Sequence, residues 1–66
     1  MNTLELKIEM LKHNVTQADL AEAIKKSGVT MTSYMKEETV MSLDDAKIIS
    51  DFLELSNERR AEIFLN

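Results

Sequence analysis

The sequence predicts a compact all-α domain of five short helices. Its 66 residues contain no proline and a single glycine, so few positions favour tight β-turns or interrupt a helix. Serine or threonine stands ahead of each of five segments whose apolar residues recur three or four positions apart, which is typical of capped amphipathic helices. At this length we expect one domain, residues 1–66, with a small core.

The first predicted helix covers about residues 3–13. Thr3 is its expected N-cap. Asn14 is expected to end it, because asparagine tolerates the left-handed conformation that closes many helices. The side chains expected to face inward are Leu6, Met10 and Leu11.

The second and third predicted helices are separated by a very short turn. Thr16 begins the second helix, and Lys25–Lys26 are expected in its last turn, where positive charge favours the helix dipole. Ser27 caps the third helix, which covers about residues 28–36. The core residues expected from this pair are Leu20, Ile24, Met31 and Met35.

The fourth helix has the clearest apolar stripe in the chain. It follows a loop at residues 37–41 and begins at the cap Ser42. The stripe comprises Leu43, Ala46, Ile49, Phe52 and Leu53. The acidic residues on this helix, Asp45 among them, are expected to form a cap and a solvated face. A short fifth helix starts at 56–58 and is expected to pack back onto the first.

The charge is unevenly distributed along the chain. The net charge is −4, yet residues 1–36 carry five lysines and four acidic residues, whereas residues 37–66 carry three basic and eight acidic residues. Neutralisation of phosphates supplies most non-specific affinity for DNA, so an acidic chain is an unusual DNA-binding protein. Because the acidity is concentrated in the second half, the first half remains open to a nucleic-acid role.

Several function classes find no support in the sequence. There is no cysteine, which excludes disulfides and thiolate metal sites and fits a reducing, cytoplasmic environment. No nucleophile–base pattern, glycine-rich phosphate loop or set of metal ligands is evident, and no apolar run is long enough to cross a membrane. We therefore expect a cytoplasmic non-enzyme without cofactor, metal, membrane or small-molecule ligand.

Two short motifs suggest a family. Residues 16–21 form the pattern Thr-Gln-x-x-Leu-Ala, and residues 42–46 read Ser-Leu-Asp-Asp-Ala. With these, and with residues 4–8 and 49–56, the chain resembles the Cro/C1 family over nearly its whole length, most closely the short Cro-like regulators of phages and prophages of low-GC Gram-positive bacteria. The resemblance implies a repressor-like bundle with a helix-turn-helix that binds operator DNA through the major groove.

The resemblance also implies which residues contact DNA. The start of the second helix would contact the backbone, and the exposed early positions of the third would read bases. The predicted contact residues are Thr16, Gln17, Ser27, Gly28, Val29, Thr32, Ser33 and Lys36. Val29 is suited to a thymine methyl group, and the hydroxyls of Thr32 and Ser33 to base edges.

The predicted contacts are few and weakly charged, so useful affinity requires a symmetric dimer on two half-sites about one DNA turn apart. The candidate dimer surface is Ile63, Phe64 and Leu65 near the C-terminus. Tyr34 has two interpretations, as a contact to the nucleic-acid backbone or as a cover of the core with its hydroxyl in water.

The chain departs from the family at three places. Lys25 replaces the glycine usual after the second helix, Lys36 is the only basic residue of the third, and Glu37–Glu38 place carboxylates where phosphates would lie. Repulsion there would weaken DNA binding. These departures keep open a second function, in which the same fold is an antirepressor-like module that binds a protein and no longer binds DNA.

Overall fold

The computed structural model describes residues 1–65, and within them the chain forms five helices and no strand. The helices are α1 (Thr3–Lys12), α2 (Gln17–Ala23), α3 (Gly28–Met35), α4 (Leu43–Phe52) and α5 (Asn57–Phe64). The prediction of a compact all-α domain with five helices is therefore confirmed for this part of the chain.

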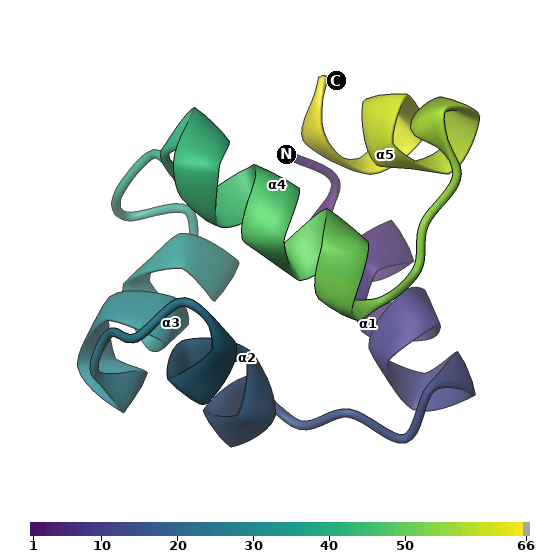
Figure 1. Ribbon diagram of the computed structural model, residues 1–66. Coiled ribbons are helices and arrows are strands. Elements are labelled where there is room, and N and C mark those ends of the chain that lie inside the picture. The colour runs from purple at the N-terminus through teal and green to yellow at the C-terminus, as the bar shows by residue number, and fades with distance from the viewer. Residues whose placement is uncertain (66) are drawn as a thin grey trace.

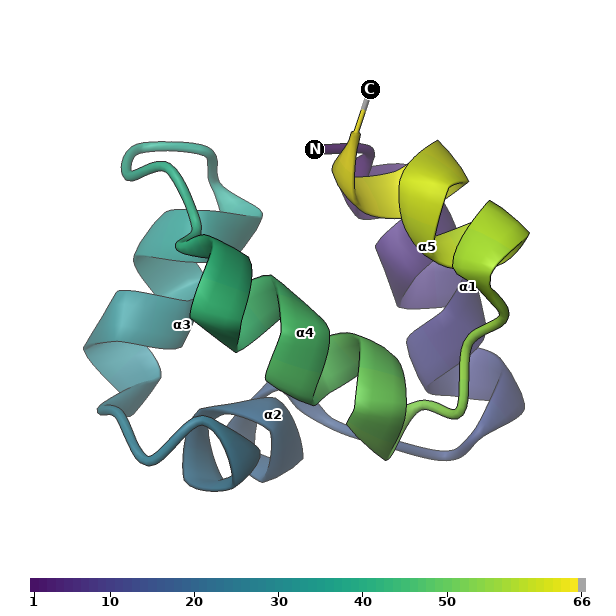
Figure 2. The same cartoon turned by 45° about the horizontal axis from the view of Figure 1, so that its top comes forward.

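Helix α4 occupies the middle of the molecule (Figures 1 and 2). The α2–α3 pair lies on one side of it, where α2 contacts both α3 and α4, and α1 and α5 pack together on the other. The amide of Asn2 donates to the carbonyl of Ile63 at 2.6 Å, which holds the N-terminal segment against α5. The fifth helix packs on the first, as expected.

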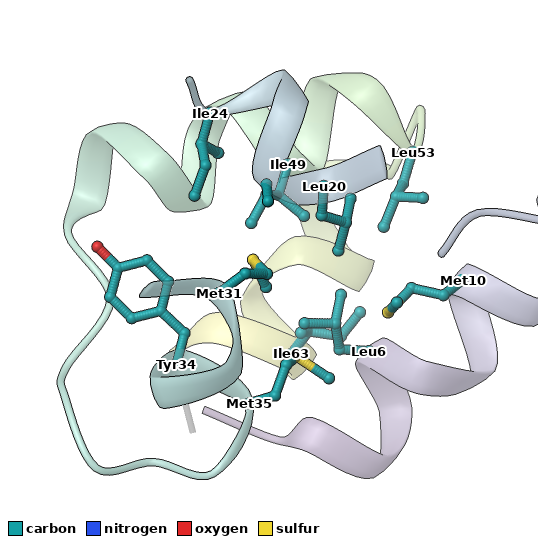
Figure 3. Close-up of a cluster of buried hydrophobic side chains, with 11 residues drawn as sticks. Leu6, Met10, Leu20, Ile24, Met31, Tyr34, Met35, Ile49, Leu53 and Ile63 are labelled. Carbon is teal, nitrogen blue, oxygen red and sulfur yellow. The ribbon is translucent and has the colours of Figure 1, made fainter. Parts of the chain in front are cut away.

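All five helices contribute to one core (Figure 3). Its buried apolar members are Leu6, Met10, Leu20, Ala21, Ile24, Met31, Tyr34, Met35, Ile49, Leu53 and Ile63. Leu11, Leu43 and Phe52 are exposed, so their predicted burial was wrong. Each helix of so short a chain buries only a narrow stripe, and these three side chains lie at its margins or at a helix end.

Four of the five predicted N-caps are confirmed. Thr16, Ser27, Ser42 and Ser56 each accept a hydrogen bond from the backbone amide three residues later. At α1 the prediction was wrong, because the cap is Asn2, whose side chain accepts from the Glu5 amide at 3.2 Å. Both asparagine and threonine are good caps, and the bond from Asn2 to α5 holds the extended backbone that a cap requires.

The first four helices end in the same way. One residue beyond each C-cap adopts a left-handed conformation, with φ between 54° and 59°. These residues are Asn14, Lys25, Glu37 and Glu54. Two backbone bonds close each end in a Schellman arrangement, which satisfies carbonyls that the helix leaves free. The expectation for Asn14 is confirmed, whereas Lys25–Lys26 lie beyond the end of α2 and not in its last turn.

An ion cluster joins α1 to α5. The Arg59 guanidinium donates to the buried Glu9 carboxylate at 2.7 Å and pairs with Glu5 at 2.8 Å. The hydrogen bond from Arg59 lowers the pKa of Glu9, and a further bond from Lys12 assists, against the opposing effect of burial. The charged cluster therefore reinforces the apolar contact of the two helices.

Candidate nucleic-acid interface

The core fixes how α3 is presented to solvent. Leu20 of α2, its C-cap Ile24 and Met31 of α3 are buried together and point into the shared core (Figure 3). Only the four residues 24–27 separate the two helices, so α3 begins close to the end of α2. One side of α3 is anchored in the core, and its other side, beside the start of α2, remains uncovered.

That uncovered side forms a shallow depression of about 520 Å³, here called the α3 surface. It is lined by Gln17, Ala18, Gly28, Val29, Thr32, Ser33, Lys36 and Glu38. Six of the eight residues predicted to contact DNA are among them, and the structure therefore brings these six together. The remaining two, Thr16 and Ser27, are exposed N-caps whose hydroxyls accept the amides of Asp19 and Thr30.

A hydrogen bond joins the two helices within the α3 surface. The Gln17 side-chain amide donates to the Thr32 hydroxyl at 3.1 Å. Gln17 is the first residue of α2, and Thr32 lies in the middle of α3. The bond therefore fixes the start of α2 against the exposed side of α3, and the residues predicted to meet the backbone and the bases form one continuous surface.

Gly28 has no structural role in the fold. Its φ angle is not positive, so its backbone does not need glycine. A Cβ atom added here would have no atom within 4 Å apart from its immediate surroundings in the chain. The missing side chain leaves space on the α3 surface for an external molecule to approach the backbone.

The charge on the α3 surface is balanced. Lys36 and Glu38 both line the depression. Glu37, the other acid of this loop, pairs with the amino group of Met1 at 3.6 Å and thus faces the N-terminus. Of the two carboxylates predicted to oppose phosphates, Glu38 therefore lines the α3 surface and Glu37 does not.

Sequence reasoning missed a buried polar network behind α3. The Tyr34 hydroxyl donates to Asp45 Oδ2 of α4 at 2.8 Å, and Lys26 Nζ bonds the same oxygen. The Lys26 ammonium also lies 5.9 Å from the centre of the Tyr34 ring. The expectation of a solvated Asp45 was wrong, because this side chain is buried between α3, α4 and the turn before α3.

Opposing influences act on the pKa of the Asp45 carboxyl. Burial is the largest single influence and raises the pKa, but the hydrogen bonds from Lys26 and Tyr34 together hold the pKa below its usual value. The bond to Asp45 likewise raises the pKa of Lys26. The prediction that Tyr34 covers the core is confirmed, but its hydroxyl donates to the Asp45 carboxylate and does not face water. No local pattern in the sequence indicates these partners, which lie 8 to 19 positions apart.

The predicted dimer surface needs correction. Ile63 has no exposed surface and belongs to the core, so it cannot meet a second chain in the folded protein. Phe64 is half-buried and Leu65 is 74% exposed. Two adjacent grooves of about 140 and 260 Å³ share Leu43, Ala46 and Phe64 as lining residues. The apolar surface near α5 therefore includes the start of α4.

Other kinds of site receive no support from residues 1–65. Within this range no group of three or more histidine, cysteine, aspartate or glutamate side chains could hold a metal ion. No helix there is long and apolar enough to cross a membrane. Comparison with protein-family models, curated proteins and solved structures found no match for this chain.

Proposed function

We propose that the protein is a sequence-specific DNA-binding transcriptional regulator of the Cro/C1 type, of phage or prophage origin. In this proposal α2 and α3 form a helix-turn-helix, and α3 enters the major groove. The observation that carries the proposal is the α3 surface, where Gln17 at the start of α2 and the exposed side of α3 form one continuous face. Placement of α3 in the groove would bring Gln17 to the DNA backbone.

The same surface explains why the protein would act as a dimer. Lys36 is the only cation lining it, and Glu38 opposes the phosphates. A single domain would therefore release few counterions and bind weakly, whereas two domains on adjacent half-sites double the contacts. The second copy would bind the apolar grooves that Leu43 and Phe64 line, which include Phe64 and Leu65 of the predicted dimer surface.

The low positive charge of the α3 surface favours one alternative function. In it the protein is an antirepressor-like module that binds another protein through the same surface. Lys26 is held by the Asp45 carboxylate and does not line the α3 surface, so it adds little positive potential there. Val29, exposed beside Glu38, would suit a protein partner with an apolar and basic surface. In that case DNA of any sequence would bind weakly.

Binding to DNA at two salt concentrations separates the functions. We would measure fluorescence anisotropy with the DNA flanking the protein's own gene, and with scrambled DNA, at about 50 and 200 mM salt. Sequence-specific binding that weakens with salt supports the proposal. Absence of binding to the flanking DNA at low salt with micromolar dimer contradicts it and favours the protein partner.

A lysine pair provides the matched control. Lys36→Gln should reduce the slope of log K against log salt by about 0.9 for each subunit, the value for one lost phosphate contact, and so by about 1.8 for a dimer on two half-sites. Lys7→Gln makes the same change at an exposed lysine of α1 that lines neither the α3 surface nor the apolar grooves. This variant should keep the wild-type slope. Equal effects of both substitutions would show that α3 is not the binding face.

A further inference from the structure

We infer that self-association of the protein depends on Arg60, whose guanidinium binds a carboxylate of the second copy when that copy covers the apolar grooves. The inference rests on the proposed dimer and states what its interface requires. Arg60 lines the larger of the two grooves, of about 260 Å³, together with apolar residues of α4 and α5. Its side chain is half-buried there in the single chain.

The charges that line the larger groove are all positive. They belong to Lys47 and Arg60, and the other lining residues are uncharged. Lys47 is paired with Asp51 at 3.0 Å. Among residues 1–65 no carboxylate pairs with Arg60, whose Nη2 donates to the side-chain oxygen of Asn57 at 3.2 Å. Arg60 is therefore the one charged lining residue of this groove without an opposite charge in the described chain.

The preceding residue, Arg59, shows how this chain satisfies an arginine that is partly removed from water. Its guanidinium is also half-buried, and it binds the carboxylates of Glu5 and Glu9 at 2.8 and 2.7 Å. The two arginines are neighbours on α5, but only Arg59 is neutralised within the chain. The charge of Arg60 lies on the surface that the second copy would cover.

Cover of the groove by an apolar surface alone would be unfavourable. Removal of a charged group from water is costly unless an opposite charge and hydrogen bonds replace its hydration. Asn57 accepts from one of the five N–H groups of the guanidinium, which leaves the others to be satisfied when water is excluded. A carboxylate matches this geometry with two parallel hydrogen bonds. The molecule that covers the groove therefore has to supply a carboxylate.

A second copy of the chain carries suitable carboxylates beside its own grooves. Asp44 and Glu58 are exposed, and each follows a residue that lines the larger groove, Leu43 and Asn57 respectively. In a two-fold symmetric dimer, Arg60 of each copy would meet the same acid of the other, so two equivalent bonds form. The acidic excess of residues 37–66 thus favours a second copy as the occupant.

Sedimentation equilibrium of the full chain without DNA tests this inference. The wild-type dimer should weaken as salt rises from about 50 to 500 mM, because salt screens the paired charges. Arg60→Gln should raise the dimer Kd about a hundredfold at low salt, which is about tenfold for each of the two symmetric bonds. The same variant should lose most of the salt dependence, a change that loss of apolar contact would not cause.

Lys7→Gln is the control for net charge. It removes one positive charge at an exposed residue of α1 that lines neither groove, so the dimer Kd and its salt dependence should stay as in the wild type. Circular dichroism should show both variants folded, since neither side chain belongs to the core.

An exchange of charges identifies the acid that Arg60 meets. Arg60→Glu should prevent association at low salt, because two carboxylates then face each other. Addition of Glu58→Arg or of Asp44→Arg to the same chain should restore the dimer for the residue that is the partner.

The possible failures are distinguishable. If the wild-type chain remains monomeric at about 1 mM, the inference and the proposed dimer are both wrong, the grooves are left to a different protein, and the anisotropy experiment decides DNA binding independently. If a dimer forms but its Kd is unchanged in Arg60→Gln, or neither exchange of charges restores it, the dimer stands and the inference is overturned.

Discussion

The Tyr34→Phe substitution tests whether the buried network holds α3 against α4. The change removes only the hydroxyl that donates to Asp45 Oδ2 at 2.8 Å and leaves the ring in the core. Hydrogen bonds to charged groups contribute about 1.5–3 kcal/mol to stability. Because the Asp45 carboxylate is itself buried, water cannot readily replace the lost donor.

This loss is large for so small a domain. A chain of 66 residues has a free energy of unfolding of about 3–10 kcal/mol. One kcal/mol corresponds to about 4–8 °C in Tm for a domain of this size, so Tyr34→Phe should lower Tm by at least about 6 °C. Urea unfolding at pH 7, followed by far-UV circular dichroism, measures the free energy.

A double-mutant cycle isolates the bond between the two side chains. Combination of Tyr34→Phe with Asp45→Asn should give a coupling energy above about 1 kcal/mol, because both substitutions act on one hydrogen bond. Asp51→Asn is the control on the same helix, since its exposed carboxylate bonds Lys47 and not Tyr34. A loss below about 0.5 kcal/mol for Tyr34→Phe, or equal coupling to Asp45 and Asp51, would refute the reasoning.

Three further predictions concern pH, a helix end and a glycine. The pKa values of Asp45 and Glu9 are lowered in the folded protein, so the stability they contribute is fully present above their unfolded pKa values of about 4 and is lost as the pH falls below them. Urea midpoints between pH 3 and 7 should decrease toward acid, and a midpoint that rises toward acid would contradict this. Lys25→Gly should stabilise the fold by about 1 kcal/mol because glycine adopts a φ of 59° without strain, whereas Lys47→Gly, within α4, should destabilise it by a similar amount. Gly28→Ala should stabilise the fold by up to about 1 kcal/mol, which raises Tm, and yet weaken DNA binding, because the new methyl stands on the α3 surface; a fall in Tm would contradict the reasoning.

Local features of the chain could be predicted from the sequence. The caps Thr16, Ser27, Ser42 and Ser56 satisfy amides only three residues away, so the short pattern around each contains the whole interaction. The α3 surface was predictable for the same reason. Half of its eight residues lie on one side of α3, and Gln17 and Ala18 of α2 are brought to them by a short turn.

Features that join distant segments could not be predicted in this way. The partners of Asp45 come from α3 and from the turn before it, and an acidic residue near a helix start is usually solvated. Ile63 is buried because α5 packs on α1, which no local pattern distinguishes from an exposed apolar terminus. The choice of Asn2 over Thr3 as a cap likewise depends on a bond to α5.

The left-handed helix ends are positions where single substitutions could make the fold more stable. Lys25, Glu37 and Glu54 hold positive φ angles that glycine or asparagine would adopt with less strain, by about 1 kcal/mol at each position. They close three different helices, so their effects should add. The combined gain of about 3 kcal/mol equals the upper end of the usual range for a destabilising substitution. Substitutions that give the α3 surface a new binding preference could therefore lower the stability of the fold, and glycine at these helix ends would restore it.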